Sequence, residues 1–141
     1  MPDRVCIVTD STAHFTEPDF AARNNVTVVP LSLHLGGETF QDGGGLTTAQ
    51  LFARLAGGAL MPVVTSPTPE QFSQTYQTLS RAARDILSIH VSGKLSQTVE
   101  HARAAAGRAP NRAAIHVVDS LTTSVGLGWL DRVLGGLFGV L

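Results

Sequence analysis

The sequence has few charged residues and almost no lysine. Charged side chains make up 15% of the 141 residues, against about a quarter in an average globular protein. Lys94 is the single lysine, and the arginines are spread along the chain without a cluster. With a formal net charge of −1, the sequence lacks the basic patch that binds nucleic acid or an anionic membrane. The low charge also predicts an apolar face that a ligand, a domain or a partner covers.

Cysteine and long apolar segments are equally scarce. Cys6 is the only cysteine, so an internal disulfide is excluded, and its place in the apolar run 5–8 predicts a buried core residue. The first residues lack the apolar stretch of a signal peptide. No segment approaches the roughly 20 apolar residues that span a bilayer. The sequence therefore predicts a cytoplasmic protein without a membrane span.

Four β-branched runs are spaced along the chain, at 5–9, 26–35, 86–91 and 114–118. The runs around Cys6, Ile89 and Val117 are continuously apolar, without alternation. This pattern is typical of strands buried on both faces, as in a parallel sheet.

The segments between these runs have helical patterns, at 16–24, 47–55, 68–79 and 96–106. The clearest start is Thr68-Pro69-Glu70-Gln71, which has a hydroxyl cap, proline at the first helical position and Gln71 to complete a capping box. We expect Thr16 to cap the first helix, with Asp19 at the same spacing. Strands that alternate with helices predict a single α/β domain over 1–141, with a mostly parallel sheet flanked by helices.

The last segment, 121–141, is strongly apolar. It carries only two charges, Asp131 and Arg132. The pair Gly135-Gly136 is expected to weaken a helix there by about 1 kcal/mol per glycine. Because such a tail has to be buried, we interpret 121–141 as the interface to a second domain, or its start. One alternative function is an interaction domain that pairs through this tail.

Hydroxyl-rich turns follow the predicted strands, at 9–12, 65–68, 92–98 and 119–124. In a parallel α/β sheet, ligands bind beyond the carboxyl ends of the strands, so we expect these turns to converge on one edge. Each turn alone is typical of a helix cap, and Thr68 is explained as a cap. Together they suit a singly charged oxyanion such as a carboxylate. A phosphate would need more positive charge or a glycine-rich loop.

Catalytic motifs are missing from the sequence. It has no G-x-S-x-G elbow and no metal-binding histidine spacing. His90 and His116 lie within predicted strands, where we expect core residues. A second alternative is a magnesium-dependent enzyme that acts on a small anionic metabolite through Asp10 and Asp119, but no second carboxylate stands beside Asp10. We predict a protein that is not an enzyme, with no catalytic residue, metal or cofactor.

Taken in order, the motifs resemble those of the bacterial DegV family. The matching segments are IVTDST at 7–12, VVPLS at 28–32, GETFQDG at 37–43, TSPTP at 65–69, SIHVS at 88–92, KLS at 94–96, VVDS at 117–120 and GLG at 126–128. Each match alone is weak, but their order along the chain is specific.

The resemblance implies the amino-terminal domain of a protein that buries one long-chain fatty acid, such as palmitate. It also implies a partner, the catalytic subunit of a fatty acid kinase, which phosphorylates the bound carboxylate. Transferred by motif, Thr65 and Ser96 would bind the carboxylate. Ser11, Thr12 and Ser66 would line the same edge.

The chain departs from the family pattern in two respects. Where the family usually has glycine and then tyrosine after the serine that corresponds to Ser96, this chain has Gln97, Thr98 and Val99. Gln97 adds bulk beside the expected head group. The second departure is the carboxyl-terminal DegV domain, which is largely absent and which the resemblance implies as the other half of the acyl tunnel.

Overall fold

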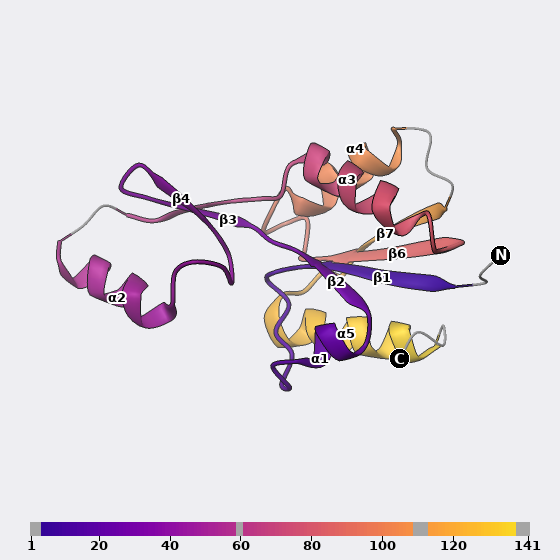
Figure 1. The fold of residues 1–141 in the computed structure, drawn as a ribbon, viewed down its shortest axis with the longest axis horizontal. Helices are drawn as coiled ribbons and strands as arrows, with labels where there is room; N and C mark the ends of the chain where they lie inside the picture. Colours follow the sequence, from indigo (N-terminus) through magenta and orange to yellow (C-terminus); the bar gives the residue numbers. More distant parts are fainter. Residues whose placement is uncertain (1–3, 59–60, 109–112, 138–141) are drawn as a thin grey trace.

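The computed structural model describes residues 4–58, 61–108 and 113–137. Its centre is a four-stranded parallel sheet with the order β2-β1-β6-β7, which confirms the predicted α/β fold (Figure 1). The strands are β1 (Val5–Asp10), β2 (Val26–Val29), β6 (Asp85–His90) and β7 (Ala114–Asp119).

Helices cover both faces of this sheet. Helices α3 (Pro69–Leu79) and α4 (Thr98–Ala106) lie on one face, and α1 (Phe20–Arg23) and α5 (Ser124–Leu137) lie on the other (Figure 1). Successive side chains of a strand point to opposite faces. Cys6 and Val8 therefore pack with Phe72 and Tyr76 in one core, and Ile7 packs with Phe20 and Leu127 in the other. The burial of Cys6 is confirmed.

A second, three-stranded antiparallel sheet extends away from the parallel sheet (Figure 1). Its order is β4-β3-β5, with β3 (Ser32–Leu35), β4 (Glu38–Gln41) and β5 (Val63–Thr65), and it is accompanied by α2 (Thr48–Ala56). We call residues 32–58 and 61–65 the arm, and the other described residues the body. The run 26–35 is therefore two strands, because Pro30 has no N–H with which to continue a ladder.

Two predicted helix starts are confirmed. The hydroxyl of Thr47 accepts a hydrogen bond from the backbone N of Gln50 at 3.1 Å, and that of Thr68 accepts one from the backbone N of Gln71 at 3.2 Å. Each glutamine bonds back to the backbone N of its threonine. Complete capping boxes thus begin α2 and α3.

The predicted helix over 16–24 is wrong in length and in its cap. Helix α1 begins only at Phe20, and Thr16 does not cap it. Pro18 explains the late start, because proline disfavours a helical backbone at the residue before it.

Strand β7 is the edge of the parallel sheet, so the predicted burial of both its faces is wrong. His116, expected in the core, is exposed, and its Nε2 lies 3.1 Å from Oδ1 of Asp85. The apolar pattern could not distinguish an edge strand from a central one.

The apolar tail forms α5 despite its glycines. Leu127 is fully buried and Leu130 packs against the same core, whereas Val125, Trp129 and Val133 are exposed. Gly128 is buried, and its position requires glycine because a side chain there would collide with the carbonyl oxygen of His14. Residues 138–141 of the tail lie outside the described residues. Among those described, the helices are all too short or too polar to cross a bilayer.

Candidate functional site

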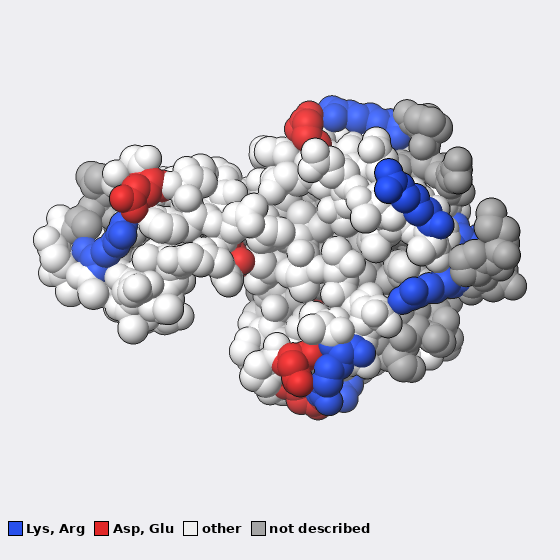
Figure 2. Space-filling view, in the orientation of Figure 1, with Lys and Arg blue, Asp and Glu red and all other residues white. Residues whose placement is uncertain are grey.

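A cleft of about 720 Å³ lies between the arm and the carboxyl edge of the parallel sheet. It brings together hydroxyls from all four predicted turns, namely Thr12, Thr65, Ser66, Thr68, Ser96 and Thr123. Its apolar lining comes from Leu31, Val64, Val91 and Leu95. Figure 2 shows few charged side chains around the junction of arm and body. The cleft therefore combines hydroxyl groups with apolar surface and little charge.

Ser96 is held at this edge by its neighbours. Its Oγ lies 3.1 Å from Oγ of Ser66, the first residue after the arm, and 2.8 Å from Oγ1 of the buried Thr98. The backbone N of Thr98 also donates to it, at 3.2 Å. These contacts place the Ser66 and Ser96 hydroxyls side by side at the start of α4.

Thr65 reaches the cleft from the last position of β5. Its Oγ1 lies 2.9 Å from Nε2 of His34 in β3, and Nδ1 of His34 lies 3.0 Å from Oγ1 of Thr39 in β4. No pattern in the sequence indicated this chain of contacts, because antiparallel pairing within the arm was not predicted.

Ser11 and Thr12 differ from the other expected residues. Ser11 is not among the cleft residues, and its hydroxyl accepts a hydrogen bond from the backbone N of Leu31 at 2.9 Å. Thr12 lines the cleft, but its hydroxyl and its backbone N both donate to Oδ1 of Asp10. Both residues therefore fix the loop after β1.

Asp10 is part of a fully buried polar chain beneath the cleft. Its Oδ2 lies 3.0 Å from Nδ1 of His90, whose Nε2 lies 2.6 Å from Oγ of Ser88. That Oγ in turn lies 2.7 Å from the hydroxyl of Tyr76. The predicted core position of His90 is confirmed. The bonded chain itself was missed, since its members are far apart in the sequence.

The pKa values of this chain follow from burial and bonding. Burial alone would raise the pKa of Asp10, but the bonds from His90, Thr12 and the backbone of Val91 together hold it below its usual value. Burial raises the pKa of Tyr76 to about 12, against the smaller opposing effect of Ser88. Asp10 is therefore an ionised carboxylate that is already saturated with donors.

Asp119, the other acidic residue at the carboxyl edge, also has a structural role. Its carboxylate accepts hydrogen bonds from the backbone N of Gly93, at 3.1 and 3.2 Å, and of Leu121, at 3.0 Å. It thereby ties the loop after β6 to the loop after β7. Across the described ranges, no three His, Cys, Asp or Glu side chains are grouped to hold a metal ion.

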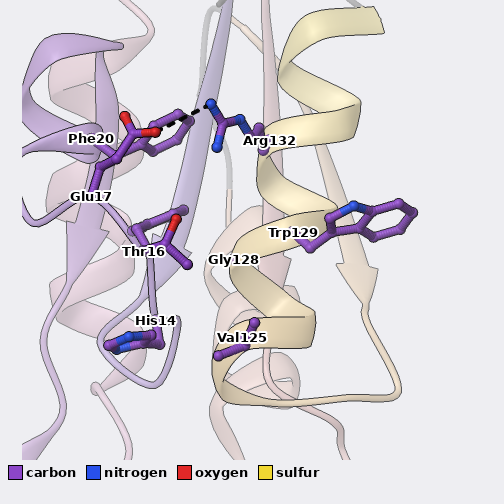
Figure 3. A pocket seen from close by; sticks show the side chains of 9 residues that line it. His14, Thr16, Glu17, Phe20, Val125, Gly128, Trp129 and Arg132 are labelled. Carbon is purple, nitrogen blue, oxygen red and sulfur yellow. Dashed lines mark ion pairs between the residues drawn. The ribbon is translucent and has the colours of Figure 1, made fainter.

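A smaller cavity of about 90 Å³ lies between the loop after β1 and α5 (Figure 3). Phe20, Trp129 and the pair of Glu17 and Arg132, whose charged groups are 3.5 Å apart, contribute to its wall. This volume corresponds to about three water molecules. It is far too small for a long acyl chain, and none of the hydroxyls expected to bind a ligand lines it.

Known proteins resemble this chain in sequence and in fold. The family described as "Uncharacterised protein, DegV family" matches residues 4–133. A DegV domain-containing protein of Deinococcus radiodurans is 40% identical over 124 residues, which are 88% of this chain and 43% of that protein. One of Streptomyces coelicolor is 37% identical over 131 residues, which are 92% of this chain and 45% of that protein. The chain thus spans less than half the length of these curated relatives.

A solved structure gives the same result for the fold. The chain is similar to a DegV family protein from Thermus thermophilus that is described as binding fatty acid, with a TM-score of 0.88 and 36% sequence identity. The match covers 96% of this chain and 48% of that protein. On sequence and on fold, the chain belongs to the DegV family.

Proposed function

We propose that the chain binds a long-chain fatty acid in the cleft, with the carboxylate held by the hydroxyls of Thr65, Ser66 and Ser96. The observation that carries this proposal is the meeting of these three hydroxyls in one cleft that also has apolar walls. The similarity to the fatty-acid-binding protein from Thermus thermophilus supports it.

The chemistry of the cleft suits this ligand. A carboxylate loses strong hydration when it is buried and has to regain hydrogen-bond donors. The Ser66 and Ser96 hydroxyls, whose oxygens are 3.1 Å apart and share a hydrogen bond, would turn from each other to donate their protons to a carboxylate. The acyl chain would lie against Val64 and Leu95, which are 60% and 68% exposed without a ligand. Each buried methylene contributes about 0.8 kcal/mol.

The expected roles of Ser11 and Thr12 become indirect in this proposal. The Thr12 proton is directed to Asp10, so Thr12 offers the cleft lone pairs rather than a donor. Ser11 supports Leu31, which lines the cleft. We assign both residues to shaping the edge, and the carboxylate to the other three hydroxyls.

The chain would act as a carrier rather than an enzyme. The proposed partner is the catalytic subunit of a fatty acid kinase, which receives the bound carboxylate; this rests on the family resemblance. We also propose that a carboxyl-terminal DegV domain covers the cleft and that residues 1–141 form one α/β domain. The coverage of less than half of each relative supports this division.

Lipid analysis and calorimetry test the proposal. Native mass spectrometry and lipid extraction of the purified chain should find a long-chain fatty acid, and calorimetric titration should show binding of palmitate. The double variant Thr65→Ala, Ser96→Ala should bind palmitate more weakly by about 2–4 kcal/mol, because two bonds to a charged group are lost.

The matched control is Thr78→Ala, which removes an exposed hydroxyl on α3 that donates to Gln74 and does not line the cleft. It should leave the affinity for palmitate unchanged. Equal affinities in the wild type and the double variant, or no fatty acid under any condition, would contradict the proposal.

A further inference from the structure

Three side chains on one face of the arm sheet form a hydrogen-bonded chain that ends at the cleft. Thr39 and His34 are directly opposite each other in the pairing of β4 with β3. Thr65 in β5 is opposite Ser32, so it is diagonal to His34 and within reach of its ring. The two ring nitrogens lie 3.0 Å from Oγ1 of Thr39 and 2.9 Å from Oγ1 of Thr65. Thr65 lines the cleft, whereas His34 is not among the cleft residues and contacts Thr65 from the arm.

The direction of these hydrogen bonds decides what Thr65 offers the cleft. A threonine hydroxyl has one proton, and a ring nitrogen either donates or accepts. If Nε2 of His34 accepts the Thr65 proton, only lone pairs of Thr65 face the cleft, and these repel a carboxylate. If Nε2 carries a proton and donates it to Thr65, the Thr65 proton is available for a carboxylate.

Thr39 can take the role that the second direction requires. In the described part of the chain, its hydroxyl is the one hydrogen-bond partner of Nδ1 of His34. When Thr39 donates to Nδ1, a neutral ring has to carry its single proton on Nε2. A doubly protonated ring gives the same direction, since both nitrogens then donate. Proton donation runs from the ring toward Thr65 in these two forms, and it is reversed only in a neutral ring that is protonated on Nδ1 and donates to Thr39.

We propose that His34, oriented by Thr39, is a positioning residue that directs the Thr65 proton into the cleft and so selects a carboxylate over an uncharged head group. Both the selectivity and the choice of proton arrangement rest on the proposed function of the cleft, because a carboxylate held by Thr65 requires the Thr65 proton. A carboxylate can only accept hydrogen bonds, whereas the hydroxyl of a fatty alcohol can donate or accept. Only the acid therefore depends on the direction that His34 imposes.

Nitrogen NMR of the chain with ¹⁵N-labelled histidine tests the proton arrangement without any ligand. The His34 signals are assigned by their loss in His34→Gln. We expect a ring with a proton on Nε2 and with Nδ1 either accepting or also protonated. A ring protonated on Nδ1 alone would overturn the inference, whether or not the chain binds a fatty acid.

Binding measurements test the selectivity. In the wild type, His34→Leu and His34→Gln, affinities are measured for palmitate and for hexadecanol, its uncharged analogue. His34→Leu should lower the ratio of acid to alcohol affinity about fivefold, the effect of one hydrogen bond. His34→Gln should restore most of the ratio, because its amide can donate to Thr65.

The outcomes distinguish this inference from the proposed function. If His34→Leu weakens both ligands equally, His34 only supports the arm, and the inference is overturned while fatty-acid binding stands. If the wild type binds neither ligand, the proposed function fails, and the NMR result alone decides the proton arrangement of His34.

Discussion

The body and the arm contribute to the same cleft but are built in different ways. In the body, Phe72 and Tyr76 are fully buried and a polar chain from Asp10 to Tyr76 is enclosed. In the arm, Phe52 is 65% exposed and no residue of α2 is buried. The body supplies Ser96 and the arm supplies Thr65. One side of the cleft is therefore fixed by a core, and the other by strand pairing and side-chain hydrogen bonds.

This difference indicates how changes in the two regions should act. The free energy of unfolding should depend mainly on the body, because burial of apolar surface is the dominant favourable contribution to folding. Residues of the arm should affect ligand binding more than global stability. Each variant of a body residue below is compared with a second variant, which serves as its control. The pairs are given from the largest expected change in the free energy of unfolding to the smallest.

Asp131 should give the body a strong pH dependence. This aspartate of α5 is completely buried, and both carboxyl oxygens lack a hydrogen-bond partner among the described residues. Burial, together with the nearby charge of Asp10, raises the pKa of Asp131 to about 8 from a usual value of 3.8, despite a smaller opposing effect of Thr9. At a pH between these two pKa values, Asp131 is ionised in the unfolded chain but keeps its proton in the folded chain.

The stability of the wild type should therefore fall by on the order of 5 kcal/mol as the pH rises from about 4 to about 8. Asp131→Asn should abolish most of this loss in urea unfolding at several pH values. Asp85→Asn is the control, since bonds from Arg84 and His116 keep the pKa of Asp85 below its usual value. If the free energy of unfolding depended on pH in the same way in the wild type and in Asp131→Asn, the raised pKa of Asp131 would be refuted.

Two phenylalanines give the most direct contrast in packing. Phe72→Ala should lower the free energy of unfolding by about 3–5 kcal/mol, because it leaves a cavity in the core of the body. Phe52→Ala in the arm should lower it by less than about 1 kcal/mol, since the ring is already exposed. Chemical denaturation measures both, and similar losses would show that the arm has a core of its own.

The carboxylate contacts of the two regions should also differ. Asp10→Asn should lower the free energy of unfolding by about 2–3 kcal/mol, because bonds to a buried charge are lost. Glu38→Gln breaks the exposed contact with Arg54, which is 2.8 Å long in the arm, and should change stability by about 0–1 kcal/mol. An equal effect of both substitutions in urea unfolding would contradict the assignment of stability to the body.

The helix caps should give the smallest contrast. Thr68→Ala should lower global stability by about 1 kcal/mol, because α3 is packed in the body. Thr47→Ala removes the same kind of cap from α2, and should appear as faster amide hydrogen exchange within α2 rather than as a global loss. If amide exchange in α2 required global unfolding, the stability of the arm would not be separate from that of the body.

The sequence predicted those features that depend on neighbouring residues. The capping boxes at Thr47 and Thr68 are complete within four residues, so their patterns predicted helix starts correctly. The hydroxyl turns were also placed at one edge, because the carboxyl ends of parallel strands meet there.

Features that depend on distant pairing were not predicted. Pro30 marked a break in the run 26–35, but nothing in the run indicated which strands its second half pairs with, so the arm was missed. Asp10 and His90 are 80 positions apart, and their bond follows from the pairing of β1 with β6. His34 was not part of a recognised sequence motif, because its hydrogen-bond partners are on the two neighbouring strands of the arm.

The central claim is that Thr65 from the arm and Ser96 from the body hold one carboxylate. Palmitate labelled with ¹³C at its carboxyl carbon, titrated into the wild type, Thr65→Val and Ser96→Ala, tests it directly by NMR. We predict a bound carboxyl resonance that is distinct from that of free palmitate and that shifts in each variant. A bound resonance that is identical in all three proteins would contradict the claim.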